Sequence, residues 1–122
     1  MSPKDKVEIA REHLAKAQEE LNGDLRDAVQ WAFASLEAAI DALAAEEGIA
    51  IDQLHWKRTN AAKELHQKGI LPSDPSTLHG ELNVLRKAIF YEGEELEEDG
   101  FSVEDAVVEV EAIVEIASER AS

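Results

Sequence analysis

The sequence predicts an all-α protein, an antiparallel up-and-down bundle of four to five helices that forms one domain over residues 1–122. Apolar residues recur three and four positions apart within each long segment, which is the period of an amphipathic helix. Capping residues and glycines separate these segments at intervals that suit a bundle. A chain of 122 residues can bury one hydrophobic core without disulfides or metal.

The first two expected helices have clear boundaries. Ser2 is a suitable N-cap ahead of a proline at the first helical position, and an Asn-Gly pair at 22–23 ends this helix. The second helix is expected over 24–47, between an Asp24 cap and a Gly48 stop. Its many alanines make it apolar on more than one face, so we expect it to be the central helix. Its aromatic residues Trp31 and Phe33 are expected in the core, and either one would be an interface anchor if left outside.

The second half of the chain predicts three more helices. Residues 49–56 have no clean period and are expected as an ordered loop or a short turn of helix, since a strand there would have no partner in the chain. A third helix is expected from about Thr59 or Asn60 to Lys68. A fourth helix is expected over about 75–98, and a fifth begins at the capping pattern Ser102-Val-Glu-Asp105. The buried stripe expected for the fourth helix is Leu78, Leu82, Leu85, Ile89 and Leu96.

Charge and composition restrict the classes of function. The net charge of −15 argues against broad nonspecific binding of nucleic acid, because the summed field repels phosphate. The sequence has no cysteine and no apolar run long enough for a membrane span, so we expect a cytoplasmic protein that does not enter a membrane. An acidic surface can also serve solubility or adaptation to salt, with the basic residues merely pairing with it, and this interpretation has equal weight with a functional one.

One segment departs from this acidity. Residues 57–87 carry a net charge of about +3, so a locally basic region lies within an acidic chain. Arg86 stands out in this region, because a guanidinium beside Lys87 and close to Phe90 and Tyr91 can form a fork onto a phosphate or carboxylate. A structural ion pair with a glutamate of the fifth helix is the equally weighted alternative.

The histidines and carboxylates do not predict a metal or cofactor site. His13, His55, His66 and His79 form no pair at ligand spacing on one helix. His66 and His79 flank the turn between the third and fourth helices, and we expect them to be ordinary surface or capping residues. The acidic run over 92–99 lacks the loop pattern of a calcium site and is expected to be a solvated face.

Two stretches carry a family resemblance: Ala61-Ala-Lys-Glu-Leu-His-Gln-Lys-Gly-Ile-Leu-Pro72, and then Leu78, Leu82, Leu85, Arg86 and Phe90-Tyr91. Together with the alanine-rich second helix, they resemble a HEPN-superfamily domain. The resemblance implies a helical bundle that dimerises. In active members of the family it implies a metal-independent ribonuclease, often the toxin of a toxin–antitoxin pair whose partner is a nucleotidyltransferase.

The sequence departs from the active pattern of that family, which is an arginine, a polar residue and then a histidine about one to two helical turns later. Arg86 matches the arginine, but Lys87 follows it, and Tyr91, Glu92 and Gly93 stand at the histidine positions. A tyrosine, with an ordinary pKa of about 10, is a poor general base near neutral pH. The resemblance therefore favours the fold over the activity.

Three hypotheses follow. The first is a non-enzymatic dimeric module that binds a partner protein, a nucleotide or RNA through Arg58, Lys63, Arg86, Lys87 and Tyr91. The second is a ribonuclease toxin in which Arg86 stabilises the scissile phosphate, while Tyr91 or a histidine such as His66 or His79 acts as the base. The third is an acidic, antitoxin-like interaction protein. We place the non-enzymatic module first because the catalytic histidine is missing.

Overall fold

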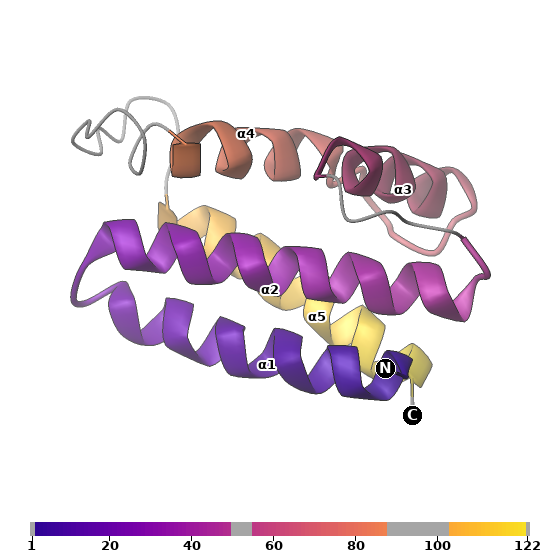
Figure 1. Cartoon of the computed structure of the whole chain (residues 1–122), viewed down its shortest axis with the longest axis horizontal. Coiled ribbons are helices and arrows are strands. Elements are labelled where there is room, and N and C mark those ends of the chain that lie inside the picture. Colours follow the sequence, from indigo (N-terminus) through magenta and orange to yellow (C-terminus); the bar gives the residue numbers. More distant parts are fainter. Residues whose placement is uncertain (1, 50–54, 88–102, 122) are drawn as a thin grey trace.

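The computed structural model describes residues 2–49, 55–87 and 103–121, with the backbone alone for 55–59. These ranges form five helices and contain no strand. The all-α helical bundle predicted from the sequence is confirmed (Figure 1). The helices are α1 (Pro3–Glu20), α2 (Leu25–Glu46), α3 (His55–Gln67), α4 (Ser76–Lys87) and α5 (Val103–Ala121).

The first two helices begin and end as predicted. At the start of α1, the Asp5 N–H donates to Ser2 Oγ and the Ser2 N–H donates to Asp5 Oδ2, both at 3.2 Å, which forms a reciprocal capping box. At the start of α2, Asp24 Oδ1 accepts a hydrogen bond of 2.9 Å from the Arg26 N–H. After α2, Gly48 has a φ of 69°, a left-handed conformation that ends the helix.

Helix α2 is the central helix, as its alanine content predicted. It packs against each of the other four helices. Figure 1 shows α1 on one side of α2, α3 and α4 on the other side, and α5 behind. Ser35, which is fully buried, donates from Oγ to the Ala10 carbonyl at 2.7 Å and so ties α2 to α1. The largest fully buried apolar side chains of α2 are Val29, Leu36, Ile40 and Leu43.

Helix α3 begins earlier than expected. It starts at His55, whereas the predicted start was at about Thr59 or Asn60, so the predicted boundary is wrong by about one turn. No glycine or proline lies between Gly48 and Gly69, so nothing in the sequence stops the helix from including residues that lack an apolar period. The end of α3 is as predicted, because Gly69 has a φ of 77°.

Helices α4 and α5 complete the core from two directions. Ser76 is the first residue of α4, and its N–H donates to Asp74 Oδ1 at 2.9 Å. The expected continuation of α4 to residue 98 and the expected cap at Ser102 lie outside the described residues. The predicted stripe of α5 is buried at Val103, Val107, Val110, Val114 and Ala117. None of the described helices combines the length and the apolar composition of a membrane-spanning segment.

Candidate functional site

The structure places the predicted binding residues at two separate positions, one on α3 and one at the end of α4. Arg86 and Lys87 form its last turn, whereas Lys63 is an exposed residue of α3. Figure 1 shows α3 beside the start of α4, with the last turn of α4 at the opposite end. Lys63 is therefore separated from the Arg86–Lys87 pair. The side chain of Arg58 and the whole of Tyr91 lie outside the described residues.

Two lysines of the basic segment are accompanied by carboxylates. Lys68 Nζ lies 3.6 Å from Glu64 Oε1 on the same helix. Partial burial raises the pKa of the Asp74 carboxyl, but hydrogen bonds at the start of α4 and the nearby charges of His66 and Lys63 hold that pKa below its ordinary value. The two basic residues at the end of α4, in contrast, form no ion pair with any described carboxylate.

Arg86 is half-buried and is oriented by two neighbours. One of its Nη atoms donates to Asn83 Oδ1 at 3.2 Å, and its guanidinium carbon lies 4.9 Å from the centroid of the Phe33 ring in α2. The alternative of an ion pair with a fifth-helix glutamate is not found for any glutamate in the described part of α5. Because a guanidinium carries five N–H donors, Arg86 retains donors for an anionic ligand.

The Nε of Arg86 is not available to a ligand. It is buried and has no hydrogen-bond partner among the described residues. An anion would therefore contact the Nη groups of the guanidinium, which carry four of its five N–H donors. The Phe33 ring, itself only 4% exposed, provides the surface on which the guanidinium rests. Such a cation–π contact contributes about 0.5–2 kcal/mol and limits the orientations of the planar group.

His79 packs on the same aromatic ring. It lies on α4 seven positions before Arg86, which is about two helical turns, and its ring stacks on Phe33 with centroids 5.3 Å apart. Its Nε2 lies 3.1 Å from Glu37 Oε2 in α2, and the residue is 1% exposed. The expectation of a surface or capping histidine is therefore wrong for His79, which belongs to the core. The spacing of positions 79, 82 and 86 was the signal that could have placed it on an inward face.

His66 has a different role. Its Nδ1 lies 2.9 Å from the Leu71 carbonyl oxygen, so it supports the turn between α3 and α4 and fits the expectation of a capping residue. His66 and His79 thus have separate partners. His79, the histidine that shares the Phe33 ring with Arg86, is buried against Glu37. The described arrangement at the end of α4 is suited to electrostatic binding of an anion, and it offers no exposed histidine for proton transfer at that position.

No group of three or more His, Asp or Glu side chains within residues 2–49, 60–87 and 103–121 is arranged to hold a metal ion. Comparison of the chain with protein-family models, with curated proteins and with solved structures finds no match.

Proposed function

We propose that this chain is a cytoplasmic, non-enzymatic helical module, HEPN-like in fold, that dimerises and binds the phosphates of RNA or of a nucleotide with Arg86 and Lys87. The observation that supports this most is the Arg86 guanidinium. It rests on Phe33, is held by Asn83, and has no ion pair with any described carboxylate. A guanidinium that is fixed in place and has no carboxylate partner in the described ranges is suited to an incoming anion.

Phosphate suits these two residues better than a carboxylate does. A phosphate presents several oxygens, so a planar guanidinium can donate two parallel hydrogen bonds while a neighbouring ammonium contacts another oxygen. Lys87 directly follows Arg86 and is exposed. The alternative of a ribonuclease has less support, because His79 is buried and its Nε2 lies against Glu37.

The acidic body of the protein gives this binding an unusual dependence on salt. At very low ionic strength the net charge of −15 repels phosphate over a long range. At about 0.1 M salt the Debye length falls to roughly 10 Å, which screens distant carboxylates more than direct contacts. We therefore expect the affinity for RNA to rise as salt is first added and to fall only at higher salt, whereas most proteins that bind nucleic acid lose affinity throughout.

Fluorescence anisotropy with a labelled short single-stranded RNA tests the binding. We expect the double variant Arg86→Gln/Lys87→Gln to bind at least about tenfold more weakly than the wild type, because two direct phosphate contacts are lost. The matched control is Lys4→Gln/Lys6→Gln in α1, which removes the same two charges elsewhere and should change the affinity less than about twofold. Equal losses in both variants, or no binding by the wild type at any salt concentration, would contradict the proposal.

The same RNA, incubated with the protein and a chelator, tests whether the module is non-enzymatic. We expect no cleavage at high protein concentration. Metal-independent cleavage that is lost in Arg86→Gln would instead establish the ribonuclease alternative, and His79 would then be the first residue to test as the missing base.

Dimerisation is measured independently by sedimentation velocity. Besides the family resemblance, it is supported by two large apolar side chains in the described ranges, Val84 on α4 and Val108 on α5, which are 69% and 59% exposed. We expect a dimer at tens of micromolar protein and a weaker one in Val84→Ser/Val108→Ser. A wild-type protein that sediments as a monomer at that concentration would remove dimerisation from the proposal and leave the RNA test unaffected.

A further inference from the structure

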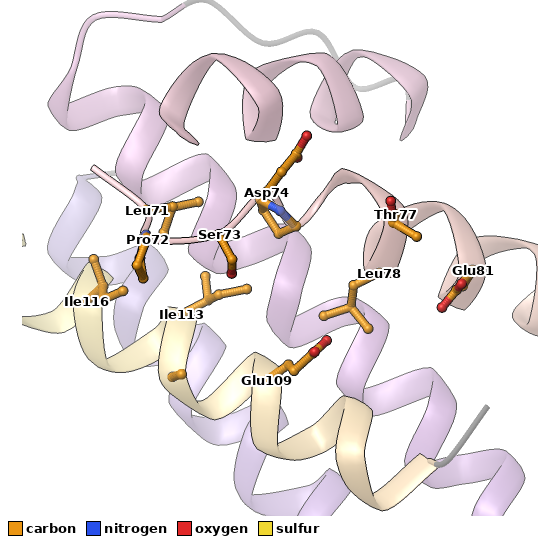
Figure 2. A pocket seen from close by; sticks show the side chains of 12 residues that line it. Leu71, Pro72, Ser73, Asp74, Thr77, Leu78, Glu81, Glu109, Ile113 and Ile116 are labelled. Carbon is orange, nitrogen blue, oxygen red and sulfur yellow. The ribbon is translucent and has the colours of Figure 1, made fainter. Parts of the chain in front are cut away.

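A groove of about 300 Å³ lies between α5 and the segment that joins α3 to α4 (Figure 2). Its apolar floor consists of Leu71 and Leu78 on one side and Ile113 and Ile116 of α5 on the other. The groove exists because α4 and α5 both pack against α2 but make little contact with each other in the described ranges. Its volume is at the lower end for ligand sites and suits two or three side chains.

Acidic residues border this floor. Figure 2 shows the carboxylates of Glu81, from α4, and Glu109, from α5, on either side of Leu78. Both glutamates are exposed, and neither forms an ion pair with any residue of the described ranges. Among the described residues, no lysine, arginine or histidine lines the groove. The groove therefore combines an apolar floor with uncompensated negative charge.

A third carboxylate lies at the groove but is already engaged. Figure 2 shows the Asp74 side chain directed toward α3, and its Oδ1 accepts the hydrogen bond from the Ser76 N–H. The nearby charges of Lys63 and His66 also act on it. Asp74 thus belongs to the turn, and Glu81 and Glu109 are the carboxylates that remain for a ligand.

From this combination we propose that the groove binds a short segment of a partner protein that carries lysine or arginine between aliphatic residues. The aliphatic side chains lie on the Leu78–Ile113 floor, and the cation lies between Glu81 and Glu109. Charge complementarity selects this occupant. The chain's own sequence between α4 and α5, residues 88–102, contains no lysine or arginine and does not complement these carboxylates. This site is separate from Arg86 and does not depend on binding of RNA there.

Three synthetic pentapeptides test the proposal with the full-length protein: acetyl-Leu-Lys-Leu-Lys-Leu-amide, a second peptide with serine for each leucine, and a third with glutamine for each lysine. Titrations are followed by the backbone amide signals of the protein in NMR. We expect saturable binding of the first peptide with a dissociation constant of about 1 mM or below, centred on residues 112–116 and 77–81. The other two should bind at least about fivefold more weakly, because each lacks one of the two kinds of contact.

Variants separate docking in the groove from attraction to an acidic protein in general. Glu81→Gln/Glu109→Gln should weaken binding of the first peptide about fivefold, whereas Glu8→Gln/Glu19→Gln on α1 removes the same charge elsewhere and should change it less than twofold. Ala112 is an exposed residue of the groove on α5. Ala112→Glu obstructs the floor while it adds negative charge, so docking predicts weaker binding and general attraction predicts stronger binding. No saturable binding, or stronger binding by Ala112→Glu, would overturn the proposal.

Discussion

At the scale of single residues, Trp31 and Phe33 show how two neighbouring aromatic side chains of α2 acquire different environments. Phe33 fills the core as expected, at 4% exposure. Trp31 is only half-buried, and residues of α1 cover its ring: His13 stacks on it with centroids 5.1 Å apart, and Lys16 Nζ lies 4.3 Å from its centroid. Trp31 therefore packs at the edge of the core. His13, which stacks on Trp31, has a pKa that burial and Lys16 both lower.

The pKa of His13 gives a test of this cluster. Burial lowers that pKa below its ordinary value, Lys16 lowers it further, and Glu12 acts in the opposite direction. We expect Lys16→Gln to raise the pKa of His13, measured from its Cε1–H signal in an NMR titration, while Lys4→Gln leaves it unchanged. An unchanged pKa in Lys16→Gln would show that Lys16 does not act on the imidazole.

The same lowered pKa determines the sign of a pH effect on stability. Between the folded and the unfolded pKa of His13, the unfolded chain binds the proton more readily than the folded protein does. The contribution of His13 is therefore fully present above the unfolded pKa and is lost as pH falls through the folded pKa. In Lys16→Gln the pH range between the folded and the unfolded pKa of His13 should become narrower, because the folded pKa rises toward the unfolded one.

At the scale of elements, α4 presents different residues to different neighbours. Leu78 and Leu82 contribute to the core, His79 and Arg86 contact the Phe33 ring, and Glu81 borders the groove beside α5. A helix has 3.6 residues per turn, so positions one apart point about 100° away from each other. A single short helix can therefore take part in the core, the candidate anion site and the groove at once.

Two glycines near α4 predict opposite results for one chemical change. Gly80 lies inside α4, and a Cβ there would meet no atom within 4 Å, so Gly80→Ala should stabilise the protein by up to about 1 kcal/mol. Gly69 has a φ of 77°, so Gly69→Ala should destabilise it by about 1–2 kcal/mol even though the space is open. Urea unfolding measures both changes, and each variant controls for the other. Shifts in the same direction would contradict the backbone conformations described above.

At the scale of the whole molecule, repulsion among carboxylates opposes folding. The net charge is −15, and the ion pairs between described residues include only a few basic groups, such as Arg26 with Asp24 and Arg120 with Glu47. Their side chains are partly exposed, so each pair contributes little. Screening of the repulsion should therefore stabilise the folded state.

We expect a rise in sodium chloride from about 20 mM to about 200 mM to raise the Tm by roughly 3–6 °C, which corresponds to about 1 kcal/mol for a domain of this size. Thermal unfolding followed by circular dichroism measures the shift. A control at constant ionic strength, with sucrose added, separates charge screening from general stabilisation by a cosolute. A Tm that does not depend on salt would mean that the carboxylates are spaced too widely to repel one another.

Local patterns in the sequence determined most of the fold. The caps at Ser2 and Asp24 and the stop at Gly48 follow from hydrogen bonds and backbone conformations that involve only neighbouring residues. Apolar residues three and four positions apart identified the buried residues of α1, α2 and α5, because this spacing shows which side of a helix is apolar. The first turn of α3 was missed for the same reason, since that turn has no apolar period to detect.

The tertiary structure alone decided which residues meet. Periodicity gives the inward direction of a side chain but not the helix that it faces, so the sequence could not pair His79 with Glu37, which is 42 positions away. Nor could it place Phe33 under Arg86, or join Glu81 to Glu109 around an apolar groove. The basic segment of the sequence borders an acidic groove because α5 supplies one of its carboxylates. Such contacts depend on how whole helices pack, and that packing is determined by the core as a unit.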